Sequence, residues 1–344
     1  MTSPSHQSLA ETLQTWLLFD STTGREKAFL EHLEERFEDA GWQCERQDVS
    51  ADRWNLVIDD GEPTRLLFST HVDTVPPHLP VRQQEGRIHG RGACDTKGGL
   101  LAMWHAAETL RRQGVKGLGF LLVVGEEVDH IGAIKARELD LNPRRILLCE
   151  PTQNRVVSAQ KGMLRFTLQS SGVAGHSAFP GDGHSALEPM LDALEGLRQH
   201  RWPTDDTLGA TTFNIGVLQS GVAANIFAPE ARAELLFRAT GPIEELFDEL
   251  RPLLGEKVTL ADAVYNDPVF FDPPDEVPTC TVPFNTDATY LGELGPVWLV
   301  GPGDIRLAHG DEESIGLDEI VAGIERYLQL SAMALHLDIP STQE

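Results

Sequence analysis

The sequence predicts an α/β protein whose mixed, largely parallel sheet is flanked by helices, with an inserted α+β domain of the ferredoxin-like type. Three observations support this fold class. Continuous apolar runs such as FLLVV and ILL, at residues 120–124 and 146–148, are typical of strands buried on both faces of a parallel sheet. Helical patterns, with apolar residues three and four positions apart, alternate with these runs. After about residue 160, apolar and polar residues alternate instead, which is typical of half-buried strands.

The outer parts of the chain, residues 1–159 and 269–344, are expected to form one domain. Two helices open it, and two apolar runs split by DDGEP predict neighbouring strands. A glycine-rich loop then leads into a helix with a single apolar stripe, which comprises Leu100, Met103, Trp104, Ala107 and Leu110. In chain order we expect helices at 8–20 and 24–41, strands at 55–58 and 64–71, the striped helix ending at 112, strands at 117–127, 143–152 and 295–300, and a closing helix at 316–335.

Residues 160–268 are expected to form the inserted domain. Their patterns give the order strand, helix, strand, strand, helix, strand, which is the order of a small ferredoxin-like sandwich. The six segments are residues 161–172, 185–199, 211–221, 231–241, 242–255 and 256–264.

Composition limits the function. A chain of 344 residues favours roughly two domains. Its 28 Lys and Arg against 53 Asp and Glu give a formal charge of -25, which argues against nucleic acids and anionic membranes as partners. No apolar run approaches the ~18 residues that span a bilayer, and the N-terminal segment does not resemble a signal peptide, so a soluble cytoplasmic protein is expected. The four cysteines form no C-x-x-C pair, so neither a zinc knuckle nor a disulfide framework is indicated.

Acidic residues and histidines follow the predicted strands of the first domain. Because ligands bind at the carboxyl ends of the strands in open α/β sheets, these side chains could converge on one crevice. Two imidazoles and several carboxylates in one pocket need neutralising, and a divalent metal does that best. The residues concerned are His71 and Asp73, Glu126 and Glu127, Glu150, His309, and Asp95 at the start of the striped helix.

Each of these residues also has an ordinary structural interpretation. A single histidine at a strand end is more often a hydrogen-bonded structural residue than a ligand, and acidic pairs are typically solvated. The recurrence at several strand ends favours a metal site. Five ligands with one bridging carboxylate give three per ion, which predicts two ions about 3.5–4 Å apart with room for a shared water. Glu126 and Glu127 should point apart on extended backbone, so one is expected to bind metal and the other to move protons.

The motifs STHVDTVP, GRGACDTKGG, VVGEEVD, CEP and GPGDIRLAHGDEES, in this order and spacing, resemble those of the dinuclear metallopeptidases and deacylases. This family includes acetylornithine deacetylase, succinyl-diaminopimelate desuccinylase and carboxypeptidase G2. The resemblance covers essentially the whole chain. It implies two divalent ions, Zn²⁺ or Co²⁺, with Asp95 as the bridging carboxylate; His71 and Glu150 would bind one ion, and Glu127 and His309 the other.

The same resemblance implies that Glu126 is the general acid and base and that the Asp73 carboxylate orients His71. In the inserted domain, GVAGHSAFP resembles a turn whose histidine, here His176, reaches into the partner subunit's active site in related dimeric enzymes and stabilises the oxyanion. A homodimer through the inserted domain is therefore expected. By the residues alone, His176 would be an ordinary surface-turn histidine.

The stretch NIGVLQSGVAANIFAPEARAELLFR resembles the segment whose Asn and Arg hold the substrate carboxylate, which points to Asn225 and Arg238. Arg238 could equally form an ordinary salt bridge. The implied reaction is hydrolysis of an N-acyl-L-amino acid, in which a water between the ions gives its proton to Glu126. In this family Glu rather than Asp at the position of Glu150 accompanies deacylases and carboxypeptidases.

The stretches SGVAANIFAPEA and GPGDIRLAHGDEE look most like acetylornithine and acetylcitrulline deacetylases, which implies a role in arginine biosynthesis. GDEES departs from the commoner Pro-Asp-Glu-aromatic ending, which affects the substrate rather than the chemistry. Four alternatives stay open: a hydrolase that frees lysine or ornithine from an acidic carrier protein, which a chain of charge -25 would repel; a succinyl-diaminopimelate desuccinylase; a metallo-carboxypeptidase; and a metal-depleted binding or scaffold protein.

Overall fold

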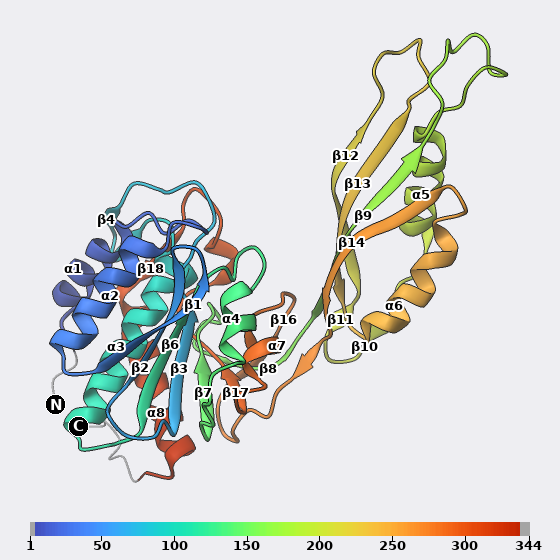
Figure 1. Cartoon of the computed structure of the whole chain (residues 1–344). Coiled ribbons are helices and arrows are strands. Elements are labelled where there is room, and N and C mark those ends of the chain that lie inside the picture. The colour runs from blue at the N-terminus through green and yellow to red at the C-terminus, as the bar shows by residue number, and fades with distance from the viewer. Residues whose placement is uncertain (1–3, 338–344) are drawn as a thin grey trace. The chain divides into compact units, whose positions relative to one another are not determined.

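The computed structural model describes residues 4–337, which divide into two compact units (Figure 1). The second unit consists of Ala159–Phe270 and Thr281–Asn285, and the other described residues form the first. The short segment Thr281–Asn285 was not part of the insertion expected from the sequence. The chain comes back to the second unit there for five residues, and their apolar pattern does not show to which unit they belong.

A six-stranded sheet forms the centre of the first unit, in the order β1-β2-β6-β3-β7-β17. Strands β6, β3, β7 and β17 are parallel, whereas β1 and β2 are antiparallel at one edge. The predicted mixed, largely parallel sheet is thus confirmed. The strands are β1 Gln43–Ser50, β2 Arg53–Asp59, β3 Leu66–His71, β6 Leu118–Val123, β7 Arg145–Leu148 and β17 Val297–Leu299.

One expectation about this sheet was wrong. Strands β2 and β3 follow each other along the chain but are not neighbours, since β6 lies between them. Strand β6 is buried along its whole length and pairs antiparallel with β2 and parallel with β3. An apolar run predicts burial but not a pairing partner, and β1, whose exposed residues alternate with half-buried ones, was not predicted at all.

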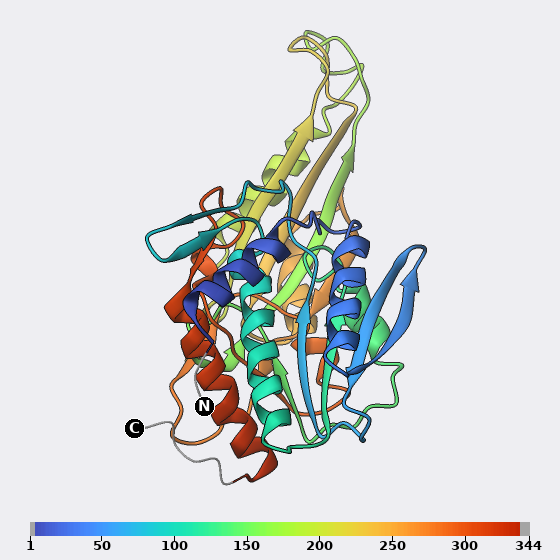
Figure 2. The same cartoon turned by 90° about the vertical axis from the view of Figure 1, so that its left-hand side faces the viewer.

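Helices cover both faces of this sheet, with α1, α2, α3 and α8 on one face and α4 and α7 on the other (Figures 1 and 2). The two opening helices, the striped helix and the closing helix are confirmed. The helices are α1 His6–Leu17, α2 Lys27–Asp39, α3 Gly98–Arg112, α4 Ile131–Ala136, α7 Ala288–Leu291 and α8 Leu317–Leu335. A small sheet of β4 Arg82–Gln84, β5 Arg87–His89 and β18 Ser314–Gly316 completes the first unit. Another small sheet, formed by β8 Val156–Gln160, β15 Val269–Phe270 and β16 Thr279–Val282, lies where the chain passes from one unit to the other.

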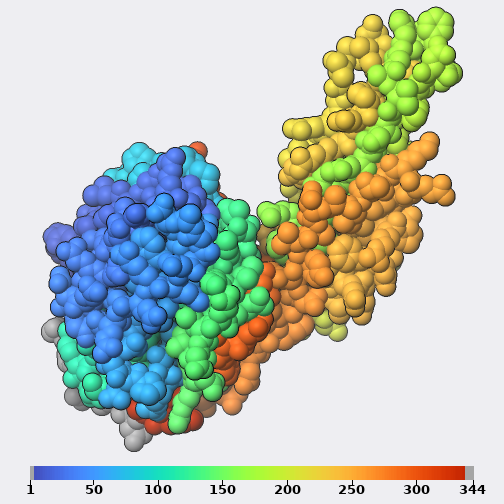
Figure 3. Space-filling view, viewed as in Figure 1, coloured from blue at the N-terminus to red at the C-terminus, as the bar shows by residue number. Residues whose placement is uncertain are grey.

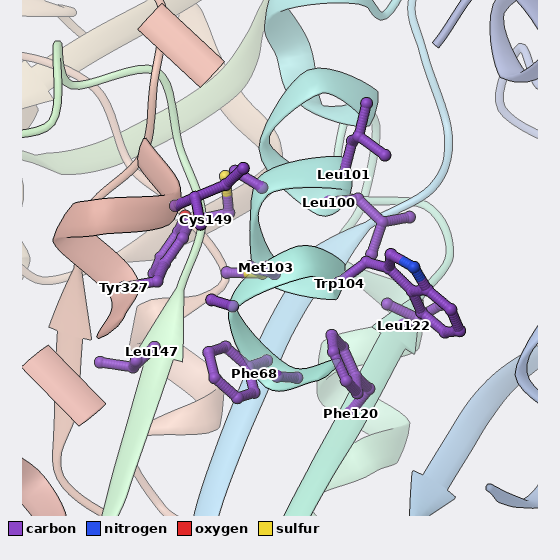
Figure 4. Packing of buried hydrophobic residues seen from close by; sticks show 14 of the residues in the cluster. Phe68, Leu100, Leu101, Met103, Trp104, Phe120, Leu122, Leu147, Cys149 and Tyr327 are labelled. Carbon is purple, nitrogen blue, oxygen red and sulfur yellow. The ribbon is translucent and has the colours of Figure 1, made fainter. Parts of the chain in front are cut away.

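Aromatic side chains fill the space between the sheet and α3 (Figure 4). Phe68 of β3 and Phe120 of β6 stack with ring centroids 5.1 Å apart. All five residues of the predicted stripe on α3 are buried. Tyr327 of α8 donates a hydrogen bond to the carbonyl oxygen of Val300, so α8 is tied to the chain just after β17.

The second unit is a four-stranded antiparallel sheet in the order β12-β13-β9-β14, with α5 and α6 packed against it. This is the strand order of a ferredoxin-like sandwich. Its elements are β9 Gly162–Ser171, α5 Leu187–Gln199, β10 Thr204–Asp205, β11 Gly209–Ala210, β12 Thr212–Ser220, β13 Glu230–Ala239, α6 Ile243–Leu250 and β14 Val258–Asn266.

All four cysteines are free thiols, and Cys94 and Cys149 are buried, as expected of packing residues. Within residues 4–337 no helix is both long and apolar enough to cross a membrane.

The start of α3 is packed too tightly for any side chain larger than glycine. A Cβ atom on Gly99 would lie 2.1 Å from Sγ of Cys149, which directly follows β7. This close approach brings the start of α3, and the loop before it, against the ends of the parallel strands.

We therefore predict that Gly99→Ala lowers the free energy of unfolding by about 1–3 kcal/mol, because the added methyl group overpacks this contact. Gly241→Ala is the matched control, since a Cβ there meets no atom within 4 Å, and it should change stability by no more than about 0.5 kcal/mol. Urea unfolding of both variants measures the difference. Equal stability of the two variants would contradict the packing argument.

Candidate functional site

The first site residues lie at the end of β3. His71 is the last residue of this strand and is buried. Its Nδ1 lies 2.9 Å from the backbone carbonyl oxygen of Asp73 and 3.5 Å from Oδ1 of the same residue. Nδ1 donates to this carbonyl, because a carbonyl oxygen can only accept, and the ring then turns Nε2 toward Asp95. The sequence predicted that the Asp73 carboxylate orients His71; the backbone oxygen of Asp73 is in fact the closer partner.

The Asp73 carboxylate holds the turn that follows β6. Its Oδ1 accepts the backbone N–H of Glu126 at 3.1 Å, and its Oδ2 accepts that of Glu127 at 3.3 Å. The hydroxyl of Thr23 also donates to Oδ2. Glu126 and Glu127 therefore lie in a turn, so the argument that extended backbone points them apart was wrong. Their side chains still face different histidines.

A buried asparagine of β2 closes the same turn. Asn55 accepts the backbone N–H of Val124 through Oδ1 and donates through Nδ2 to the carbonyl oxygen of Gly132. Gly125, which begins the turn, has φ +81°, a value that favours glycine. Hydrogen bonds from the sheet thus fix both ends of the segment that carries the two glutamates.

Asp95 lies in a buried turn, Ala93–Lys97, directly before α3, and its own backbone is not helical, with φ -120° and ψ 88°. The side chain of Glu313, which is 1% exposed, holds this turn from the far end of the chain. Oε1 of Glu313 accepts three backbone N–H groups at 2.9–3.2 Å, those of Gly92, Cys94 and Asp95. The position of Asp95 is therefore set by a residue more than 200 positions away in sequence.

Arg91 extends this link to the loop that carries His309. Its Nη1 donates to Oε2 of Glu313 at 2.7 Å and to the carbonyl oxygen of Gly310 at 3.2 Å. Its Nε donates to the carbonyl oxygen of Pro77, in the segment that follows His71. The buried Arg91–Glu313 pair thus connects the three segments that carry His71, Asp95 and His309.

Asp95 lies between two imidazoles. Its Oδ1 is 3.1 Å from Nε2 of His71, and its Oδ2 is 3.4 Å from Nε2 of His309. The same nitrogen of His309 lies 3.0 Å from Oε2 of Glu127. One oxygen of Asp95 facing each histidine is the arrangement that a bridging carboxylate requires.

Glu150 follows β7 and is 4% exposed. Within residues 4–337 its carboxylate has no hydrogen-bond or ion-pair partner. Burial, together with the charges of Asp95 and Glu126, raises the pKa of Glu150 well above its ordinary value. A buried carboxylate without a partner is costly, and a cation at this point would remove the cost.

The pKa values of other groups in the site are also raised. Burial raises the pKa of Glu126 to about 8, against the opposing charges of His71 and His130. Hydrogen bonds with Asp95 and Glu127 raise the pKa of His309 to about 10. Carboxylates that resist ionisation beside histidines that resist deprotonation indicate a site with an excess of negative charge.

The residues present fit a divalent metal. His71, Asp95 and Glu127 each offer one ligand atom within 4.8 Å of the others. His309 lies next to Asp95 and Glu127, and Glu150 contributes its unpartnered carboxylate to the same electrostatic cluster. Imidazole and carboxylate donors suit zinc and cobalt. The distribution of the five ligands over two ions stays a prediction.

Two residues beside Glu126, His130 and Asp287, were not predicted from the sequence. His130, in the left-handed conformation at φ 55°, directs Nδ1 to Oδ1 of Asp287 at 2.8 Å and to Oε1 of Glu126 at 3.8 Å. Burial disfavours the imidazolium, but the hydrogen bond with Asp287 and the negative charges of Asp287, Glu126 and Asp73 together outweigh it and raise the pKa of His130 to about 9. His130 lies only three positions after Glu127, which is the one signal that could have drawn attention to it.

The second unit carries the remaining predicted residues. His176 and Asn225 lie on two exposed loops that pair at one end of the sheet, where the backbone N–H of Ser177 donates to the carbonyl oxygen of Asn225. In Figure 3, green and yellow segments of the second unit meet at its tip. Arg238 is near the other end of β13, opposite Thr212 and Met163. Eight residues of strand separate Arg238 from Glu230, roughly 26 Å. Within one chain, the structure therefore does not bring Asn225 and Arg238 together.

The comparison with known proteins identifies the family. A family model described as peptidase family M20/M25/M40 matches residues 67–332. The chain is 32% identical over 339 residues to a peptidase M20 domain-containing protein of Schizosaccharomyces pombe, covering 94% of this chain and 82% of that protein. It is 35% identical over 309 residues to an Aspergillus terreus protein named "Probable carboxypeptidase", covering 79% and 71%. The chain belongs to peptidase family M20/M25/M40, which confirms the resemblance at the level of the family.

Solved structures show the same fold. A tripeptidase from Staphylococcus aureus matches with a TM-score of 0.82 and 21% identity, covering 96% of this chain and 99% of that one. An M20 family metallo-carboxypeptidase from Sulfolobus solfataricus matches with a TM-score of 0.74 and 15% identity, covering 97% and 100%. These structures show the fold, and membership of peptidase family M20/M25/M40 makes this chain a hydrolase.

We predict that Glu313→Gln lowers the free energy of unfolding by roughly 3 kcal/mol, because it leaves the charge of buried Arg91 without a counter-charge. Glu312→Gln is the matched control. The side chain of Glu312 is 76% exposed and pairs with Arg82 at the surface, so loss of this ion pair should cost about 0.5 kcal/mol or less. Thermal and urea unfolding of both variants measure the two costs. Comparable losses would remove Glu313 from its role as the link between loops.

We predict opposite effects of Glu150→Gln with and without metal. In chelator-treated protein near pH 7.5, the variant should be more stable by ~1–3 kcal/mol, because a buried carboxyl without a partner is lost. Because the pKa of Glu150 is higher in the folded protein than in the unfolded chain, its carboxylate destabilises the fold increasingly as pH rises above the pKa of the unfolded state. The stability gained by Glu150→Gln should therefore shrink toward pH 5. With zinc present, the variant should retain less metal than the wild type. Melting curves of the chelated protein measure the change in stability, and elemental analysis measures the bound zinc. Destabilisation of the chelated variant would contradict the prediction.

Proposed function

We propose that this chain is a dinuclear metal-dependent amidohydrolase that cleaves the amide bond between an acyl group and an L-amino acid. One observation carries the proposal: Asp95 lies between the imidazoles of His71 and His309, with Glu126 in the adjoining turn. A bridging carboxylate with a free carboxylate nearby is what hydrolysis by two metals and a general base requires.

The five predicted ligands would hold the cations, which when bound would lower the pKa of a water molecule toward ~7 and polarise the amide carbonyl. Glu126 takes the proton of the attacking water and returns it to the leaving amine. Burial, which raises the pKa of Glu126 to about 8, suits the second step, because an acid that holds its proton near neutrality can deliver it to the amine. Asp73 positions Glu126 by accepting its backbone N–H.

We propose acetylornithine or acetylcitrulline as the substrate, with acetate as the released acid. Support comes from the likeness of residues 220–231 and 301–313 to those deacetylases and from Glu rather than Asp at position 150. The second candidate is a metallo-carboxypeptidase, which the name of the Aspergillus terreus relative favours. Both reactions release an amino acid with a free carboxylate from an acyl group, so the same centre serves either.

We further propose that the chain works as a homodimer through its second unit, with His176 stabilising the oxyanion and Asn225 and Arg238 holding the substrate carboxylate. Their placement supports this: Arg238 lies eight positions along β13 from Glu230, roughly 26 Å, and Asn225 lies in the loop beyond Glu230. The two side chains can therefore reach one carboxylate only from different subunits. His176 and Asn225, on paired loops, would then come from one subunit and Arg238 from the other.

We predict that Glu126→Gln retains its metal but loses activity by about 10²–10⁴-fold, because the proton acceptor is removed while the ligands stay. Steady-state turnover and elemental analysis of one preparation measure both quantities. A variant that turns over within threefold of the wild type would remove Glu126 from this role.

The substrate is tested by hydrolysis of N-acetylornithine, N-acetylcitrulline, N-succinyl-diaminopimelate and an acyl dipeptide, with zinc- or cobalt-loaded protein and a chelated control. Chelator-sensitive turnover of one acetyl amino acid well above the others supports the deacetylase. Preference for the dipeptide supports the carboxypeptidase instead, and turnover that survives chelation contradicts both.

We predict that His176→Ala lowers kcat by about 10²-fold, as loss of one oxyanion donor does, while metal content stays unchanged. Mixing His176→Ala with Arg238→Ala protein provides a further measurement. If the two residues act from different subunits, mixed dimers recover one intact site and activity rises above that of either variant alone. No recovery in a confirmed mixed dimer would contradict the shared site.

A further inference from the structure

Beside the predicted metal centre lies a second group of metal-binding side chains that the proposed mechanism uses only in part. Glu126, His130 and Asp287 each present one ligand atom within 4.8 Å of the others. His130 and Asp287 are buried, and none of the proposed catalytic steps uses either of them. One imidazole and two carboxylates form a donor set that zinc accepts.

The spacing of these atoms suits one tetrahedral ion. Bonds of 2.0–2.1 Å in a tetrahedron place neighbouring ligand atoms about 3.3 Å apart. Nδ1 of His130 lies 2.8 Å from Oδ1 of Asp287 and 3.8 Å from Oε1 of Glu126, values on either side of that separation. In the centre itself the corresponding distances from Asp95 to His71 and His309 are 3.1 and 3.4 Å. Small side-chain shifts would therefore place the three donors around one ion, with its fourth position left open to water.

A second, independent observation points to a ligand here. The Asp287 side chain is 1% exposed, and its Oδ2 has no hydrogen-bond partner among residues 4–337. Oδ1 of the same carboxylate faces His130, so the carboxylate that carries the unpartnered Oδ2 points into the cluster. A buried carboxylate oxygen left unsatisfied costs about 1–3 kcal/mol, which a bound cation would remove.

The charge around the site also accommodates a further cation. Six buried or nearly buried carboxylates gather here, those of Asp73, Asp95, Glu126, Glu127, Glu150 and Asp287. Two divalent ions and the imidazolium of His130 leave these six negative charges incompletely balanced. A third ion would therefore enter a region that still carries negative charge.

We propose that Glu126, His130 and Asp287 form a third, weaker zinc site, and that zinc bound there inhibits the enzyme by occupying the general base. Zinc at this site has to replace the hydrogen bond between His130 and Asp287, so the third site fills only when zinc is in excess. The carboxylate of Glu126 cannot accept the proton of water while it coordinates metal. The inhibition rests on the proposed role of Glu126, whereas the binding does not.

The binding arm uses the full chain loaded with two equivalents of Zn²⁺ and titrated with further Zn²⁺ by calorimetry and equilibrium dialysis. We expect one additional equivalent in the wild type. The test variant is His130→Asn, because asparagine tolerates the left-handed backbone at φ 55° but removes the imidazole. It should weaken the third equivalent at least tenfold. His336→Asn is the matched control: His336, which caps α8, has φ 54° and lies outside the cluster, and its replacement should leave the titration unchanged.

The inhibition arm measures turnover against free Zn²⁺, with each variant normalised to its own rate at two equivalents. Half-inhibition of His130→Asn and of Asp287→Asn should need at least tenfold more zinc than that of the wild type and of His336→Asn. A wild type that binds only two equivalents, or a third equivalent that His130→Asn binds as tightly, would overturn the site. A third equivalent that leaves turnover unchanged would overturn the inhibition. If no substrate is hydrolysed, the proposed function fails, but the binding arm still decides the site.

Discussion

The cost of burying several carboxylates in one place is the constraint on which the rest of this structure depends. Asp95, Glu126, Glu127 and Glu150 all lie where the strands of the parallel sheet end, and burial leaves the pKa of each raised except that of Asp95, where His71 and His309 outweigh it. Two histidines offset only part of this charge. Such a group is stable when cations share the pocket, and a water held by those cations becomes a nucleophile near neutral pH. The feature that makes the pocket unfavourable without metal is thus the one that supports hydrolysis with metal.

The loops that carry the site residues are held by hydrogen bonds from buried side chains, and these side chains come from distant parts of the chain. Glu313 gathers three backbone N–H groups of the Asp95 loop, and Arg91 ties Glu313 to the loop of His309. Asp73 and Asn55 hold the turn of the two glutamates in the same way. All four residues are buried, so their hydrogen bonds do not compete with water. The ligands themselves therefore need little reorganisation when a cation binds.

Substrate choice depends on parts of the molecule that the metal centre does not fix. The family relationship establishes a hydrolase. Under the proposed mechanism, a deacetylase and a carboxypeptidase would use the same five predicted ligands and the same glutamate. What distinguishes them is the pocket for the acyl group and the groups that hold the released amino acid's carboxylate. His176, Asn225 and Arg238 are the candidates for the second task, and their separation along the sheet makes assembly of the chain part of the question of specificity.

The sequence by itself determined which segments are buried strands, the apolar stripe of α3, the order of strands and helices along the second unit and the polar residues at the strand ends. These follow from periodicity and short-range spacing, which operate within a few residues. Tertiary structure alone decided that β6 separates β2 from β3, that Glu126 and Glu127 share a turn, and that Glu313 holds the Asp95 loop. It also placed Asp287 against His130 across 157 positions. Contacts of this kind leave no local pattern, because they depend on how the whole chain packs rather than on the neighbours of either residue.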